Sequence, residues 1–215
     1  MKRKALCLLV LLAVLLPVVC SAEIWYCPLC GRKNDSNFCP VDATAKPSLT
    51  NNQSGSQYIY TYYFSDHAIN FPNTLECKVY TGPGTEYVRA ANGKAEFISQ
   101  SFKYAGLDGD WMFVRCQVKG GSIRYGYIYV GGYRQTVQDV PPLSFANVQV
   151  TAVRRTGIWD SLMDDNLGPV CYIDKGTRVT HLCDFAIDGM TLAYVETYRN
   201  NQPVRGFVYP DSIGE

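Results

Sequence analysis

The chain has 215 residues, of which 47% are hydrophobic and 18% are charged, and its formal net charge is +1. Nucleic-acid-binding proteins usually have a basic patch or stripe, whereas no run of five like charges occurs in this sequence. The composition therefore argues against a nucleic-acid partner. Tyrosine (16) and glycine (18) are abundant and long helical periodicities are missing, which favours short strands joined by turns.

Residues 1–22 have the three parts of a secretory signal peptide: a basic start, an apolar run over 5–19 and small residues up to Ala22. The apolar run is shorter than the roughly 20 residues that a transmembrane helix needs. We therefore expect cleavage after Ala22 and no transmembrane span in the mature chain. The expected location is extracytoplasmic, either secreted or associated with the cell envelope.

The segment "CPLCGRKNDSNFCPVD", residues 27–42, has the spacing of a zinc site. Cys27 and Cys30 stand three positions apart, so both thiolates can point at one ion at about 2.3 Å. Cys39 begins what resembles a second pair, whose partner position holds a carboxylate. The predicted ligands of a structural zinc are Cys27, Cys30, Cys39 and Asp42. A disulfide or a degenerate site is the alternative, because thiols oxidise outside the cytoplasm.

Composition divides the rest of the chain into two blocks. Residues 23–42 form the zinc-ribbon-like segment, and 43–57 are small and polar, as in a flexible linker. The two blocks cover 58–138 and 144–215, and a short linker, 139–143, joins them through two prolines that a central strand would not contain.

The two blocks repeat one pattern. Each has a strand with a large apolar residue three positions before a valine, Trp111 in the first block and Leu192 in the second. Each then has a turn and closes on glycine, aromatic and aliphatic residues, at Gly126 and Gly206, which lie 80 positions apart. A repeat of this length indicates a duplicated domain. About five short strands per block predict an all-β fold of small, half-open barrels.

Both blocks resemble bacterial SH3-like domains, which are small barrels of exported and cell-wall-associated proteins. In the first block the resemblance is found in "VYTGPGTEY" (79–87), "GDWMFV" (109–114) and "GYI" (126–128). In the second it is found in "GTRV" (176–179), "AYVE" (193–196) and "RGFV" (205–208). The second block lacks the Gly-Pro-Gly turn and has Leu192 where the family often has tryptophan. The resemblance implies two tandem SH3-like barrels after the zinc-ribbon-like segment.

In the family, shallow grooves lined by aromatic residues contact peptidoglycan peptides. The matching positions, and hence the predicted ligand-binding residues, are Tyr80, Tyr87, Trp111 and Tyr127. The alternative is that these side chains are ordinary strand and core residues, because tyrosine favours strands and is often half-buried. The resemblance implies an exported, non-catalytic binding protein for a peptidoglycan peptide or glycan. A protein–protein interaction or sensor adaptor of the cell envelope, with a zinc-responsive or redox-responsive head, is the second hypothesis.

The sequence has no familiar catalytic motif, such as Gly-x-Ser-x-Gly or His-Glu-x-x-His. His181 and Cys183 face the same way along a predicted strand, which leaves a weak hydrolase as a third hypothesis. The later cysteines either pair as two disulfides or remain thiols; they are Cys77, Cys116, Cys171 and Cys183.

Replacement of Asp42 tests the fourth zinc ligand. We expect Asp42→Ala to lower the zinc content of the mature protein, because three thiolates leave one tetrahedral position without a protein ligand. Asp42→Cys should keep the metal. Elemental analysis of the purified proteins measures both, and an unchanged zinc content in Asp42→Ala would remove Asp42 from the ligand set.

Overall fold

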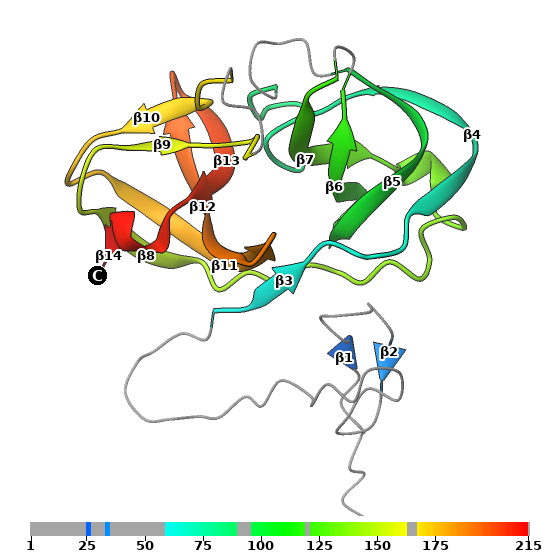
Figure 1. The fold of residues 1–215 in the computed structure, drawn as a ribbon, viewed down its shortest axis with the longest axis horizontal. Coiled ribbons are helices and arrows are strands. Elements are labelled where there is room, and N and C mark those ends of the chain that lie inside the picture. Colours follow the sequence, from blue (N-terminus) through cyan, green and yellow to red (C-terminus); the bar gives the residue numbers. More distant parts are fainter. Residues whose placement is uncertain are drawn as a thin grey trace, which may run out of the picture.

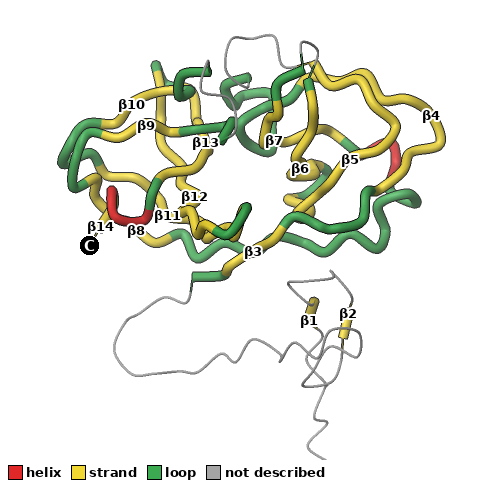
Figure 2. The backbone as a smooth tube through the Cα atoms, in the orientation of Figure 1, coloured by secondary structure: helices red, strands yellow, loops and turns green. Residues whose placement is uncertain are grey.

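The computed structural model describes residues 25–26, 33–34, 59–89, 96–118, 121–162 and 167–214. Within these ranges the secondary structure is strands and two short 3-10 turns, η2 (Gly131–Tyr133) and η3 (Pro210–Ser212), without an α-helix. The predicted all-β class is therefore confirmed (Figure 2). In the same ranges there is no helix with the length and apolar character that a membrane crossing requires.

The first half of the described chain forms a curled, four-stranded antiparallel sheet (Figure 1). Its strands, in spatial order, are β4 (Ile69–Lys78), β5 (Glu96–Asp108), β6 (Trp111–Gln117) and β7 (Ile123–Tyr129). Nearer the N-terminus, β1 (Trp25–Tyr26) and β2 (Lys33–Asn34) pair antiparallel with each other.

The second half contains a larger sheet with the order β13-β12-β11-β8-β14. The strands are β8 (Val148–Ala152), β11 (Arg178–Ile187), β12 (Met190–Arg199), β13 (Gln202–Val208) and β14 (Ile213–Gly214). A separate hairpin pairs β9 (Thr156–Ile158) with β10 (Cys171–Ile173). Two-residue turns with positive φ join the long strands of this sheet, at Asp188-Gly189 and Asn200-Asn201. Asn-Asn and Asp-Gly suit these turns because their residues tolerate left-handed backbone.

Close backbone approach explains the glycine that both halves share. Gly126 pairs with Val114, and Gly206 pairs with Val195. A Cβ atom on Gly126 would lie 2.6 Å from the Tyr80 carbonyl oxygen, and one on Gly206 would lie 2.7 Å from the carbonyl oxygen of Trp159. Tyr80 and Trp159 each exchange two backbone hydrogen bonds with the residue after the glycine. The two halves therefore reproduce the same strand crossing.

An irregularity in the strand register also occurs at the same place in each half. In β5 it lies between Tyr104 and Gly106, and in β11 it lies between His181 and Cys183. In both halves it falls beside the valine that faces the shared glycine. A β-bulge increases local twist and bends its strand, which fits the curl of both sheets.

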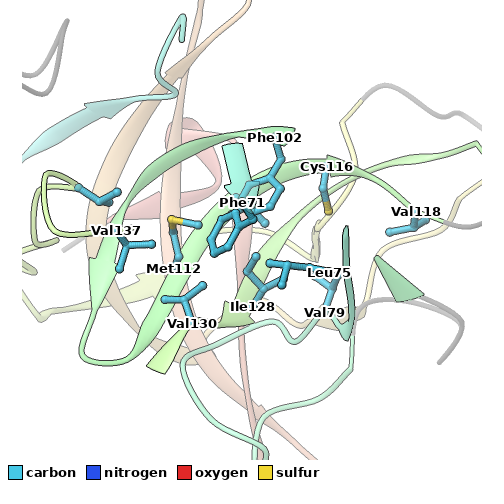
Figure 3. Close-up of a cluster of buried hydrophobic side chains, with 12 residues drawn as sticks. Phe71, Leu75, Val79, Phe102, Met112, Cys116, Val118, Ile128, Val130 and Val137 are labelled. Atoms are coloured by element: carbon cyan, nitrogen blue, oxygen red, sulfur yellow. The ribbon is translucent and has the colours of Figure 1, made fainter. Parts of the chain in front are cut away.

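Buried side chains form three clusters, one inside each half and one between the halves. The first half's cluster lies within its curled sheet (Figure 3) and contains Phe71, Leu75, Val79, Phe102, Met112, Ile128 and Val130 among others. The second half's cluster contains mainly valines, alanines and isoleucines. The third cluster, which we call the shared core, joins aromatic residues of both halves, namely Phe113, Tyr125, Tyr127, Phe185, Tyr194 and Phe207, with Leu182, Cys183, Ile187 and Leu192.

The segment that precedes each half pairs with the other half. Residues 59–65 precede the first half, but β3 (Thr61–Tyr63) runs parallel to β11, and the Asp184 amide donates to the Tyr60 carbonyl at 2.7 Å. Residues 141–146 precede the second half, but the Leu107 amide on β5 donates to the Pro141 carbonyl at 2.8 Å. The residues expected to be a linker, 139–143, are therefore hydrogen bonded to β5. Both segments cross beneath the two halves in Figure 1.

Substitution of Gly206 tests the close approach. We expect Gly206→Ala to lower the free energy of unfolding by about 1–3 kcal/mol, because the added methyl meets backbone that cannot move away. Gly132→Ala is the control, since nothing lies within 4 Å of its added Cβ, and its effect should stay within about 0.5 kcal/mol. Urea unfolding measures both variants, and equal effects would contradict the close approach.

Candidate functional site: an aromatic platform on the first half

Three aromatic side chains meet at one end of the first half, and we call them the aromatic platform: Tyr80, Trp111 and Tyr129. Trp111 begins β6 and Tyr129 ends β7, and the two residues are paired across the sheet. Their ring centroids are 5.4 Å apart, and Tyr80 makes an edge-to-face contact with Trp111 at 5.7 Å. The loop crossing at Tyr80 therefore completes a group that the β6–β7 pairing begins.

The aromatic platform is anchored on one side and open on the other. Trp111 is half-buried and packs against the shared core, while 53% of Tyr129 is exposed. Asp110 and Arg134 form an exposed ion pair beside Trp111, with Nη2 and Oδ1 2.9 Å apart. An exposed pair of this kind contributes little stability. The platform thus offers apolar ring surface with a charged rim.

Rings held in this way suit recognition more than chemistry. Tyrosine and tryptophan present large, rigid surfaces at a low cost in conformational entropy. Their rings pack on other apolar or aromatic groups for about 0.5–1.5 kcal/mol per pair. The platform can therefore bind the apolar face of a sugar or of an extended peptide.

Two of the predicted ligand-binding residues lie away from the platform. Tyr127 is completely buried in the shared core, where its hydroxyl accepts a hydrogen bond from Arg205 Nη1 at 3.2 Å. Tyr87 lies between the halves and donates its hydroxyl proton to Glu196 Oε2 at 2.7 Å. Burial raises the pKa of Tyr87, and the hydrogen bond to Glu196 raises it further, so Tyr87 stays a donor at ordinary pH.

Tyr129 is the platform residue that the sequence prediction omitted. The alternation of tyrosines in "RYGYIYV" puts Tyr125, Tyr127 and Tyr129 on one face of a strand. The first two are buried by the second half, but Tyr129 ends the strand and remains exposed. The alternation identifies the face of the strand that the tyrosines share, but it does not show at which residue the burial by the second half ends.

The second half does not repeat the three-ring platform in its described residues. Trp159 takes the place of Tyr80 in the strand crossing, and Tyr209, which is exposed, follows Val208 as Tyr129 follows Ile128. At the position of Trp111, however, the second half has Leu192, which is buried in the shared core.

The pair of His181 and Cys183 does not form an activated thiol. Cys183 is fully buried, and burial raises its pKa well above the ordinary value. His181 Nε2 lies 2.8 Å from Asp184 Oδ1, so this nitrogen is already hydrogen bonded. A thiol must become a thiolate to act as a nucleophile, and this environment opposes that change.

No group of three or more His, Cys, Asp or Glu side chains is gathered for a metal ion within the described ranges. The predicted zinc ligands Cys27, Cys30, Cys39 and Asp42 all lie outside those ranges, so the zinc site stays a prediction.

Comparisons with protein-family models, with curated proteins and with solved structures gave no match. The candidate site therefore depends on the geometry of this chain alone.

The four later cysteines are free thiols, and their burial leads to a test by alkylation. Burial raises the pKa of Cys77 to about 11 and that of Cys116 to about 12. At pH 8 about a thousandth of Cys77 is then thiolate, so we expect slow labelling of both by iodoacetamide in the folded protein. Labelling of Cys77 should accelerate toward pH 11 and precede that of Cys116.

Site-resolved mass spectrometry measures these rates, with the urea-unfolded protein as the control for intrinsic reactivity. Rapid labelling of Cys116 at pH 8 in the folded protein would contradict its burial.

Proposed function

We propose that this protein is an exported, non-catalytic binding protein with two SH3-like halves, and that it binds a peptidoglycan peptide or glycan of the cell envelope. The observation that carries the proposal is the aromatic platform, where Tyr80, Trp111 and Tyr129 meet with one side open. Planar, rigid aromatic groups at a surface are typical of binding sites.

The repeated strand crossing supports the SH3-like interpretation. Each half has a curled antiparallel sheet, a bulge beside the same valine and a glycine under a crossing loop. Each half also continues from its last long strand into a 3-10 turn, η2 or η3. These shared details favour duplication of one small β unit, as the sequence motifs imply.

In this proposal the residues bind and orient the ligand, and they do not transform it. The ring faces of Trp111 and Tyr129 contact an apolar face of the ligand, and Asp110 and Arg134 at the rim hydrogen bond with its polar groups. Cys27, Cys30, Cys39 and Asp42 would hold a structural zinc.

A protein–protein adaptor of the cell envelope is the second candidate function. Its support is that three aromatic side chains on the second half are exposed, namely Tyr172, Tyr198 and Tyr209. Exposed aromatic residues are enriched at protein interfaces. In this alternative the second half contacts another envelope protein.

Tyr129→Ala tests the platform without disturbing the core, because the side chain is largely exposed. We expect retention on purified peptidoglycan sacculi to weaken about 3-fold to 10-fold, in line with the loss of one aromatic contact. Tyr198→Ala is the matched control, since that tyrosine is 69% exposed on the second half, and it should bind like the wild type.

A sedimentation assay with sacculi measures the fraction bound for each variant. Wild-type protein that stays in the supernatant would reject the peptidoglycan ligand. A loss with Tyr198→Ala and none with Tyr129→Ala would assign binding to the second half instead.

A further inference from the structure

We infer that the second half acts as a clamp for the binding loop of the first half, and that Arg205 is the positioning residue of this clamp. The binding loop is residues 79–89, which contain Tyr80 of the aromatic platform. The inference rests on the proposed function, and it assigns the two halves different roles instead of two equal binding sites.

The binding loop is attached to its own half mainly at its beginning, where Val79 is buried in the first half's core. Tyr80 exchanges two backbone hydrogen bonds with Tyr127, and the Thr81 hydroxyl donates to the Val88 carbonyl within the loop. Gly82 leaves room for the Tyr87 ring, since an added Cβ would lie 2.1 Å from that ring. Beyond Tyr80, these contacts join residues of the loop to one another.

The second half contacts the loop at three places along its length. The Val88 amide donates to the Pro203 carbonyl at 3.1 Å. The Tyr194 hydroxyl donates to the Thr81 carbonyl at 3.1 Å, in a buried position. The Tyr87 hydroxyl donates to Glu196 at 2.7 Å. Three hydrogen bonds to the two strands β12 and β13 therefore hold the loop from Thr81 to Val88.

Arg205 connects this loop to the strand that carries Trp111. Its Nε donates to Glu196 Oε2 at 2.7 Å, the same oxygen that Tyr87 uses, and its Nη1 donates to Asp108 Oδ2 at 2.8 Å. Asp108 is paired with Trp111 at the end of the β5–β6 hairpin. One guanidinium thus fixes both sides of the platform, the loop through Tyr87 and the hairpin through Asp108.

The surroundings of Arg205 make the link rigid. The residue is only 9% exposed, and its guanidinium lies over the rings of Tyr87 and Phe145, at 5.3 and 4.9 Å from the centroids. Buried charges are stable only when they are paired and hydrogen bonded. Loss of the arginine would leave Asp108 and Glu196 together without a cation, and each would turn toward water.

The two halves differ at the positions that matter for this role. The residue of the first half that corresponds to Arg205 is Tyr125, since each precedes the shared glycine. The residue of the second half that corresponds to Trp111 is the buried Leu192. The first half therefore has the platform, and the second half has the arginine that positions it.

The test compares Arg205→Met, Arg205→Lys and Tyr87→Phe in the full mature chain, with Arg154→Met as the matched control. Arg154 is also on the second half, but its ion pair with Asp211 is exposed. The ligand-free readout is the indole N–H resonance of Trp111 in an ¹⁵N NMR spectrum, assigned with Trp111→Phe. The binding readout is retention on purified peptidoglycan sacculi, and circular dichroism checks that each variant is folded.

We expect Arg205→Met to shift the Trp111 resonance and to weaken retention about 10-fold, and Tyr87→Phe to weaken it about 3-fold. Arg205→Lys should restore part of the affinity, because it keeps the charge but not both hydrogen bonds. Arg154→Met should match the wild type in both readouts.

A folded Arg205→Met variant with an unchanged Trp111 resonance and unchanged retention would overturn the inference. If Arg205→Met does not fold, Tyr87→Phe decides by the same two readouts. If the wild type does not bind sacculi, the proposed function fails, and the Trp111 resonance still decides whether Arg205 positions the platform.

Discussion

The packing of aromatic rings between the two halves is the interaction on which the rest of the structure depends. Phe113 and Tyr194 occupy corresponding positions on β6 and β12, and their ring centroids are 5.0 Å apart across the shared core. Phe185 and Phe207 complete the cluster, in mostly tilted or edge-to-face contacts. Each such ring buries about 150–250 Å². Neither half could leave this face in water without losing a large part of its stability, so the two curled sheets form one unit.

The unit also determines how the chain can recognise a ligand. Two barrels on a flexible linker would act as independent modules and gain avidity through effective concentration. Here the leading segment of each half pairs with the other half, and Phe64 of the first segment packs on rings from both, Phe113 and Phe185. The relative position of the halves is therefore fixed by the same contacts that stabilise the fold. In the proposed function, a ligand would therefore bind to one rigid surface, with the aromatic platform at one end of the first half.

Buried polar groups between the halves fix the orientation of one half relative to the other. Apolar and aromatic contacts tolerate small rotations, whereas a buried guanidinium with two carboxylate partners requires one arrangement. The ion pairs of Arg205 with Asp108 and Glu196 impose such an arrangement on one side of the shared core. Arg124, on the last strand of the first half, and Asp160 of the second half form another buried ion pair across the halves, 2.7 Å apart. The combination explains how a core made mainly of rings can hold a loop and a hairpin in a defined position.

The sequence by itself determined the all-β class, the turns and the presence of two related blocks, because these depend on local patterns. The patterns are alternation, glycine and asparagine in turns, and a glycine followed by aromatic and aliphatic residues in each block. It also predicted Tyr80 and Trp111 as ligand-binding residues, and the structure places their two rings in contact. The tertiary structure decided which tyrosines are covered. Tyr127 and Tyr129 look alike in the alternating pattern, yet one is buried under the second half and the other is exposed. Only the packing of the halves separates them, because burial by a distant segment leaves no periodic signal in the strand that it covers.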